Sequence, residues 1–293
     1  MARVEPEPPL YAQCMPTQKC SVDSLAQFIQ VIGSCDLPSH PLWFRGQRDA
    51  AWDLRPTAQR SSYGPAEERN FIQRFRARAA VRHAATPAYP DRAAWLSLMQ
   101  HYGLPTRLLD WSRSPLVAAY FAIQDFLPPI PEGTLSRDTA VWVLAPHEFN
   151  RLRAGLLFTP SIDSGHCEDL IDEAFDPEAP APEKDALAVM ATEGDLRMFV
   201  QQGCFTVHSA RTPINRQEDS GQYLLKMIIP SECARRFALE VDLCGIRQGD
   251  LFPDLENLAA ELRHTFPAGR ATDGVPSAPS WGAKGQPEYS DEH

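Results

Sequence analysis

Two short stretches of the sequence concentrate residue types that bind ligands or transfer protons. In the first, Phe44-Arg45-Gly46-Gln47, an arginine fork adjoins a glycine that allows close approach of a ligand or another backbone. The second runs from Gln100 to Ser112 and reads QHYGLPTRLLDWS, so amide, imidazole, hydroxyl, guanidinium and carboxylate groups follow one another closely. These stretches are the first candidates for a functional site.

The second stretch contains candidate groups for acid–base chemistry. His101 stands at the end of an expected helix, where it suits general acid–base catalysis, a ligand hydrogen bond or a half-buried structural position. Arg107 and Asp110 are three residues apart, a spacing that puts them on opposite faces of a strand. We therefore expect one of the two to face the core and the other to face a cleft.

Arg45 and Trp111 each have two interpretations, and Gln202 is a further candidate. Arg45 can hold a ligand or form a buried ion pair with Asp110. Trp111 can stack on a base or a nicotinamide ring, or it can pack in the core. Gln202 precedes an expected strand and can hydrogen-bond a ribose hydroxyl, but a carboxamide lacks the full negative charge that stabilises a cation. The sequence leaves these alternatives open.

Several well-known site motifs are absent from the sequence. It has no H-E-x-x-H or other metal-ligand spacing, no C-x-x-C, no G-x-G-x-x-G, no Walker-type phosphate loop and no G-x-S-x-G. We therefore expect no metal. No apolar run approaches the roughly 20 residues of a membrane span, and the first residues lack the pattern of a signal peptide. Together with an odd count of seven cysteines, these features favour a cytoplasmic protein without a membrane partner.

Charge is strongly segregated along the chain, whose formal net charge is −10. Residues 161–195 hold eleven acidic side chains and one lysine, and so carry the entire net charge. Residues 40–120 hold twelve arginines and only six acids, which is compatible with an anionic ligand. Two interpretations of the acidic segment stay open: a solvated insert, or a flap over an arginine-lined cleft.

A mixture of helices and short strands must position these groups. Periodicity and capping residues predict helices at 21–32, 65–81, 92–102, 114–123, 231–237 and 254–266, and strands at 42–45, 106–110, 140–144, 204–208 and 222–229. Ser21 and Ser114 are the expected N-caps, Gly33 is an expected helix end, and Gly46 is expected to break the first strand. Because the elements lack regular βαβ alternation, the predicted fold class is α+β.

Proline and polar composition divides the chain into a folded body and two tails. Residues 1–20 and 267–293 are rich in proline, glycine and serine or lack apolar periodicity, so we expect them to be disordered. Residues 21–266 are expected to form one domain with the acidic insert 161–195 inside it.

The two stretches resemble the FRG domain family, which takes its name from a Phe-Arg-Gly motif. The resemblance is carried by Phe44-Arg45-Gly46-Gln47 with Trp52, Leu54, Pro56 and Arg60, by Gln100–Ser112, and by Pro115 with Ala118–Ala122. It resumes at Gln201–Thr206 and Leu251–Leu255, and so extends over about 40–260. The family name describes a sequence signature and does not supply a reaction.

The order of these parts is also similar to that of the ADP-ribosyltransferases. Their fold is a mixed, mostly antiparallel split sheet with flanking helices, in which an Arg-Gly or His-Gly strand holds NAD. A later glutamate orients the ribose 2′-hydroxyl and stabilises the oxocarbenium ion that forms as nicotinamide leaves. The sequence departs at this point, because the expected folded body has no Glu-x-Glu or Gln-x-Glu. Gln202, or an acid from 193–195 or 218–219, would have to substitute.

This second resemblance implies an assignment of roles. Catalytic roles would belong to Arg45, His101, Asp110 and Gln202, and nucleotide contacts to Gly46, Gln47, Gln100, Tyr102, Thr106, Arg107, Trp111 and Ser112. NAD would be the substrate, and a protein target would be a further partner. The leading hypothesis is thus an ADP-ribosyl-transferring or NAD-cleaving enzyme of a bacterial toxin or defence type.

Two alternatives from other classes stay open. In the first, Arg45, His101, Arg107 and Asp110 form a non-catalytic pocket for a nucleotide or a nucleic-acid end. In the second, His101 and Asp110 serve a metal-independent hydrolase. The three hypotheses differ in geometry, because each requires a different subset of these side chains to line one cleft.

Overall fold

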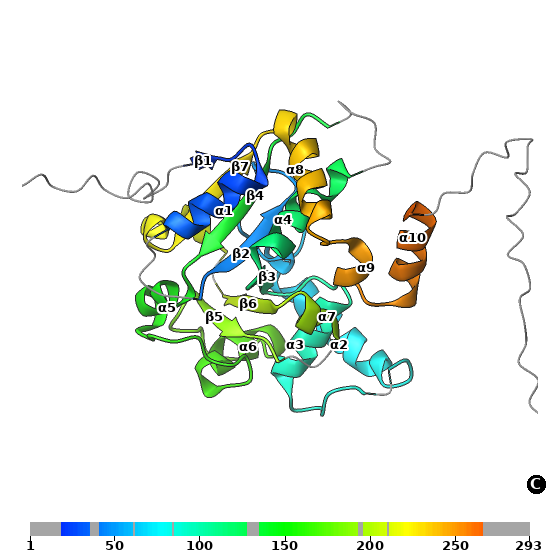
Figure 1. Cartoon of the computed structure of the whole chain (residues 1–293). Helices are drawn as coiled ribbons and strands as arrows, with labels where there is room; N and C mark the ends of the chain where they lie inside the picture. Colours follow the sequence, from blue (N-terminus) through cyan, green and yellow to red (C-terminus); the bar gives the residue numbers. More distant parts are fainter. Residues whose placement is uncertain are drawn as a thin grey trace, which may run out of the picture.

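A seven-stranded sheet forms the centre of the protein. The computed structural model describes residues 19–35, 41–60, 62–83, 85–127, 135–192, 196–209 and 211–265. Across the sheet the strand order is β1-β7-β4-β2-β3-β6-β5 (Figure 1). These strands are β1 (Lys19–Ser21), β2 (Trp43–Gln47), β3 (Leu108–Ser112), β4 (Thr139–Leu144), β5 (Ala186–Met190), β6 (Gly203–His208) and β7 (Leu224–Ile229). Among the described strands only the β1–β7 pair is parallel, so the predicted mixed and mostly antiparallel sheet is confirmed.

Most helices cover one face of this sheet. The α-helices of the described residues are α1 (Leu25–Ser34), α2 (Pro65–Ala79), α3 (Arg92–His101), α4 (Pro115–Ile123), α5 (Pro146–Ala154), α6 (Glu168–Phe175), α7 (Leu196–Val200), α8 (Ser231–Leu243), α9 (Gln248–Leu251) and α10 (Leu255–Thr265). Helices α1, α4 and α8 cover β1, β7, β4 and β2, and α2, α3 and α6 cover β3, β6 and β5 on the same face. The opposite face carries α5 and irregular segments over a third apolar cluster that contains three tryptophans.

Local capping explains where several helices begin. The Ser114 side chain accepts a hydrogen bond from the Val117 N–H, and Pro115 occupies the first turn, as the sequence predicts for α4. Helix α1 begins later than predicted because its N-cap is Ser24, whereas Ser21 ends strand β1. Gly33 lies inside α1 and does not end it. Because Lys19–Ser21 pairs with β7, the predicted disordered arm 1–20 is wrong at its last residues; residues 1–18 and 267–293 lie outside the described ranges.

The acidic segment 161–195 is part of the sheet and its helical cover. It contributes α6 and the edge strand β5, and its buried apolar side chains include Ile162, Cys167, Leu170, Ile171, Ala174, Phe175, Leu187 and Val189. Its acids pair with bases of the arginine-rich segment, including Glu173 with Arg107 at 2.6 Å and Asp172 with Arg92 at 2.7 Å. The interpretation of this segment as a solvated loop is therefore wrong.

Gly46 controls how closely α4 approaches the sheet. Strand β2 runs through Gly46 to Gln47, so the predicted strand break is wrong. A Cβ atom at position 46 would overlap the Ala118 carbonyl oxygen and lie 2.5 Å from the Ala122 nitrogen. These are backbone atoms of α4 and cannot rotate away. The glycine is therefore required because the helix backbone lies directly on the strand.

We predict that Gly46→Ala lowers the free energy of unfolding by about 3 kcal/mol or more, because the methyl group forces α4 away from β2. Gly33→Ala is the matched control, since a Cβ at Gly33 meets nothing within 4 Å. Inside α1 the alanine should raise the free energy of unfolding by about 0.5–1 kcal/mol. Urea unfolding followed by circular dichroism measures both, and equal stability of Gly46→Ala and the wild type would contradict the packing argument.

Candidate functional site

Strands β2 and β3 separate after a single residue pair. Their pairing is limited to Phe44 with Ser112, whereas β2 and β4 pair at five positions. A cleft of about 320 Å³ lies at this split. Its lining comprises Phe44, Arg45, Gly46, Gln47, Arg48, Trp52, Arg60, Gln100, Asp110, Trp111, Ser112, Val117, Ala118, Phe121, Gln124, Arg197 and Gln201. The structure thus brings seven of the predicted site residues together: Arg45, Gly46, Gln47, Gln100, Asp110, Trp111 and Ser112.

Arg45 lies at the bottom of the split with its guanidinium held in place. Its Nη1 donates to the Asp110 carbonyl oxygen at 2.6 Å and lies 3.7 Å from Asp110 Oδ2. Burial lowers the pKa of Arg45, Asp110 opposes this effect, and the neighbouring Arg60 lowers the pKa further. Its buried Nε has no hydrogen-bond partner among the described residues. The arginine therefore keeps a fixed donor that an anionic ligand can satisfy.

The Asp110 carboxylate is oriented by a short hydrogen-bond chain. Gln100 Nε2 donates to Asp110 Oδ2 at 2.7 Å, and the Thr106 hydroxyl donates to Gln100 Oε1. Because Thr106 is fully buried and bonded to the oxygen of this amide, it directs the amide nitrogen toward Asp110. Thr106 thus acts behind the cleft, while the Asp110 side chain is 55% exposed and faces it.

Positive charge predominates around the cleft. Four arginines line it, Arg45, Arg48, Arg60 and Arg197, and Asp110 is the one carboxylate among the described lining residues. Arg48 also pairs with Asp125 at 3.4 Å, and the Arg197 guanidinium lies over the Phe252 ring at 4.6 Å. Such an arrangement favours a ligand with several negative charges, because arginine binds phosphate oxygens through a planar fork.

Helix α7 forms one wall of the cleft and is tied to the rest of the protein at both ends. Arg197 Nη1 donates to the His101 carbonyl oxygen at 3.2 Å. Gln201 Nε2 donates to the Leu251 carbonyl oxygen at 2.8 Å, and the Ser112 hydroxyl donates to the Gln201 carbonyl oxygen at 2.7 Å. The wall therefore depends on the segment that follows α8 as well as on β3.

Gln202 does not line the cleft, although the sequence made it a catalytic candidate. Its φ of 49° lies in the left-handed region, and its carbonyl oxygen accepts from the Arg113 N–H at 3.0 Å. The residue is exposed and ends the turn between α7 and β6. Its neighbour Gln201 lines the cleft instead. The backbone of Gln202, rather than its carboxamide, explains its position in the structure.

Arg107 is the centre of a buried ionic cluster away from the cleft. Its Nη2 lies 2.9 Å from Glu68 Oε2, and its Nη1 lies 2.6 Å from Glu173 Oε2. Burial alone would lower the pKa of Arg107, but Glu68 and Glu173 raise it overall. Arg107 is thus buried while Asp110 faces the cleft, in line with the expectation that one faces the core and the other a cleft. Arg107 precedes β3 and contacts α2 and α6, and Asp110 contacts α3 on the same sheet face, so the expected placement on opposite faces of a strand is not confirmed.

His101 and Tyr102 also lie outside the lining. The His101 ring packs edge-on against Tyr102 with 4.9 Å between centroids, and Tyr102 is 55% exposed. The His101 carbonyl oxygen accepts from Arg197, which lines the cleft. The hydrolase alternative, which pairs His101 with Asp110, gains no support from this placement.

Two buried side chains support the cleft from the opposite face of the sheet. Gln47 accepts from the Trp142 indole N–H at 2.7 Å and donates to the Asp53 carbonyl oxygen at 3.3 Å. The Trp111 indole N–H donates to Thr206 Oγ1 at 3.0 Å, and Thr206 Oγ1 lies 2.7 Å from His208 Nε2. These bonds hold Gln47 and Trp111 in one orientation at the edge of the split.

Ten residues of the lining were not predicted as site residues, among them Trp52, Arg60, Arg197 and Gln201. Trp52 and Arg60 stand in the run after Phe-Arg-Gly, so that run was the available signal for them. Gln201 begins the run Gln201–Thr206 that also carries the resemblance, whereas Arg197 has no such signal because it reaches the cleft only when α7 docks. No cluster of three potential metal ligands occurs within the described ranges. None of the helices described there is both long enough and apolar enough to span a membrane.

Comparison with known proteins identifies one domain. Residues 40–128 match the FRG domain family, so the chain contains an FRG domain. The matched range includes β2, α2, α3, β3 and α4, and therefore Gly46, Arg45 and Asp110; the resemblance predicted over 40–260 is wider than this match. No curated protein and no solved structure matches the chain.

The buried His208 predicts a pH dependence of stability. Burial, together with Arg107 and Arg45, lowers the pKa of His208 to about 3. Between about pH 6.5 and pH 3 the unfolded chain binds a proton at this position and the folded protein does not. The free energy of unfolding therefore decreases as the pH is lowered, by up to about 1.4 kcal/mol per pH unit. His208→Gln should lower this slope in urea unfolding at pH 4–7. Identical slopes in the variant and the wild type would contradict the prediction.

The left-handed backbone of Gln202 predicts opposite effects of two substitutions. Gln202→Gly should raise the free energy of unfolding by up to about 1 kcal/mol, because glycine adopts this conformation without strain. Gln202→Val should lower it, since a β-branched side chain tolerates positive φ poorly. Thermal unfolding measures both shifts. If glycine destabilised the protein, the carboxamide would have a role that the structure does not explain.

Proposed function

We propose that the cleft binds NAD and that the protein transfers or hydrolyses its ADP-ribose. The observation that carries this proposal is the site at the β2–β3 split: a buried arginine with an unsatisfied Nε, surrounded by three further arginines and one carboxylate. A dinucleotide carries a diphosphate, which matches several guanidinium groups around one cleft.

Asp110 is the group best suited to the electrostatic part of the reaction. When the bond between the nicotinamide nitrogen and ribose C1′ breaks, nicotinamide takes the electron pair and the ribose becomes an oxocarbenium ion. A nearby carboxylate stabilises that positive charge. Asp110 is the carboxylate of the described lining, so it takes the role for which the sequence offered only Gln202 or distant acids. An acceptor nucleophile or water then adds to C1′ and loses its proton.

The remaining polar lining fits the ribose and the phosphates. Gln100 and Gln201 offer amide groups, and Arg45 offers its free Nε donor for a phosphate oxygen. Trp52 and Phe121 offer ring faces for the planar parts of the ligand. Toxin or defence activity, bacterial origin and a cytoplasmic location stay predictions of the sequence.

Two substitutions separate binding from chemistry. Arg45→Ala should weaken NAD binding about 10- to 100-fold, since a charged hydrogen bond contributes about 1.5–3 kcal/mol. Asp110→Asn should change NAD affinity only a few-fold and slow nicotinamide release about 100-fold or more. Glu148→Gln, which removes one partner of an exposed ion pair on α5, is the control and should change neither. Calorimetry measures binding, and chromatography measures released nicotinamide.

The assay must include acceptors, because transfer needs a nucleophile. Labelled NAD is therefore tested with the purified protein alone and with an extract of cell proteins. Absence of both NAD binding and nicotinamide release under all conditions would overturn the proposal. Equal release rates for Asp110→Asn and wild type would overturn the role of the carboxylate.

A non-catalytic nucleotide-binding module is the second candidate. One observation favours it: the Asp110 carboxylate already accepts from Gln100 and lies near Arg45. Both interactions reduce its ability to stabilise a second cation. NAD binding that depends on Arg45, without release of nicotinamide in any extract, would establish this alternative over the enzyme.

A further inference from the structure

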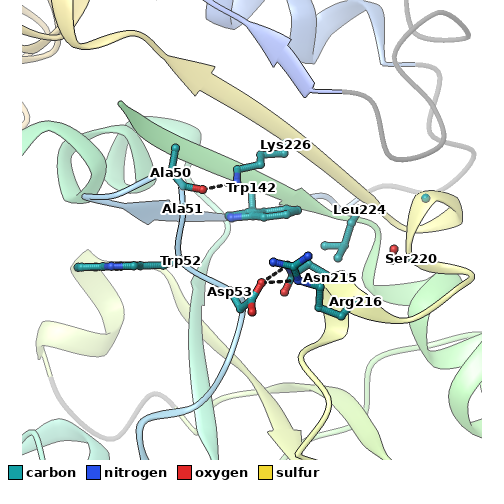
Figure 2. A pocket seen from close by; sticks show the side chains of 11 residues that line it. Ala50, Ala51, Trp52, Asp53, Trp142, Asn215, Arg216, Ser220, Leu224 and Lys226 are labelled. Carbon is teal, nitrogen blue, oxygen red and sulfur yellow. Dashed lines mark hydrogen bonds and ion pairs between the residues drawn. The ribbon is translucent and has the colours of Figure 1, made fainter. Parts of the chain in front are cut away.

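A second hollow adjoins the cleft on the other side of Trp52. Its volume is about 430 Å³, and it is lined by Ala50, Ala51, Trp52, Asp53, Trp142, Asn215, Arg216, Ser220, Gly221, Leu224 and Lys226 (Figure 2). Trp52 lines both hollows and is 45% exposed. The buried Gln47 lines the cleft and bonds to Trp142 of the second hollow. The two hollows are therefore neighbours that share one wall.

The second hollow combines an aromatic surface with cationic groups. Strand alternation puts Trp142 and Lys226 on the same face of paired strands β4 and β7, where the Lys226 ammonium lies 4.8 Å from the centre of the Trp142 ring. Lys226 also donates to the Ala50 carbonyl oxygen, which holds the ammonium at the rim. Figure 2 shows Lys226 on one side of the Trp142 ring and the group of Asp53, Asn215 and Arg216 on the other.

The second cation is held by a small network on that other side. Arg216 Nε and Asn215 Nδ2 both donate to Asp53 Oδ1 at 2.8 Å, and Asn215 Oδ1 accepts from the Leu54 N–H. Asp53 is therefore already neutralised by its partners. Arg216 remains 65% exposed, so the rest of its guanidinium is accessible to a ligand. The second hollow therefore suits a ligand that has a planar ring and an attached negative charge.

We propose that this hollow binds a purine mononucleotide unit, namely the adenosine phosphate end of the dinucleotide in the cleft. This inference rests on the proposed function for the identity of the whole ligand. The purine stacks on the Trp52 indole, which is 45% exposed, because Trp142 is buried. Its phosphate lies at the edge of the Trp142 ring, between Arg216 on one side and Lys226 on the other (Figure 2). Trp52 stands where the two halves of the ligand meet. The nicotinamide ribose then lies in the cleft beside Arg45 and Asp110.

Half-ligands test this assignment on the intact protein. AMP and nicotinamide mononucleotide are titrated separately by calorimetry into wild type, Arg216→Ala, Lys226→Met and Arg45→Ala. AMP affinity should fall about 5- to 10-fold in Arg216→Ala and in Lys226→Met, and should stay unchanged in Arg45→Ala. The affinity for nicotinamide mononucleotide should fall in Arg45→Ala and should stay unchanged in Arg216→Ala and in Lys226→Met. NAD affinity should fall in all three variants.

A matched arginine provides the control. Arg236 is 73% exposed and pairs with Glu240 at 2.9 Å, much as Arg216 pairs with Asp53, but it lies on α8. Arg236→Ala should leave AMP affinity unchanged. Thermal unfolding of each variant tests whether it is folded. Arg216→Ala should affect stability least, because the Arg216 side chain is largely exposed to solvent.

The outcomes distinguish this inference from the proposed function. Absence of AMP binding to the wild type, or AMP affinity unaffected by both Arg216→Ala and Lys226→Met, would overturn the second hollow as a nucleotide site. NAD binding and nicotinamide release that survive those same variants would leave the proposed function in place. AMP binding that depends on Arg216 in a protein that neither binds nor cleaves NAD would uphold the hollow and overturn the proposed function.

Discussion

Helix α4 lies on strand β2 with no side chain between them at residue 46. This close approach fixes the position of the strand relative to the helical layer, because the α4 backbone leaves no room for even a methyl group. Strand β2 keeps its full pairing with β4 and only one pair with β3. The cleft lies at that split, and Arg45, the residue before the glycine, is one of its lining residues. In the Arg-Gly pair, Gly46 therefore allows the close packing of α4 on β2, and Arg45 beside it lines the cleft.

The charged residues of the protein fall into two kinds of environment. Arg107 is enclosed by Glu68 and Glu173, so its charge is neutralised inside the protein and joins the acidic segment to the arginine-rich one. Arg45 is less enclosed, with 19% of its side chain exposed against 6% for Arg107, and Asp110 neutralises it only partly. A buried cation with an unsatisfied donor is costly unless a ligand completes its bonding. By this contrast, Arg107 has a structural role and Arg45 is suited to binding a ligand.

The sequence was informative wherever local signals decide the structure. Helix α4 was predicted correctly because Ser114 and Pro115 act within its own first turn. Helix α6 was missed because acidic residues surround its apolar stripe in the sequence; the stripe, Leu170, Ile171, Ala174 and Phe175, is buried when α6 packs on α2, α3 and β6. In the same way Arg45 and Asp110 could be predicted from a dense motif. Arg197 could not, because tertiary docking of α7 alone brings it to the cleft.

The wall made by α7 also connects the cleft to the end of the described chain. Arg197 stacks on Phe252, Phe252 lies 6.0 Å from Phe121 between ring centres, and Gln201 is bonded to the Leu251 carbonyl. Local opening of the segment around α9 would release these contacts at a free-energy cost smaller than that of global unfolding. Any ligand that binds Arg197 in its docked position must, by mass action, lower the population of the opened state. Occupancy of the cleft is thus thermodynamically linked to amide protection in a segment far along the chain from the Phe-Arg-Gly motif.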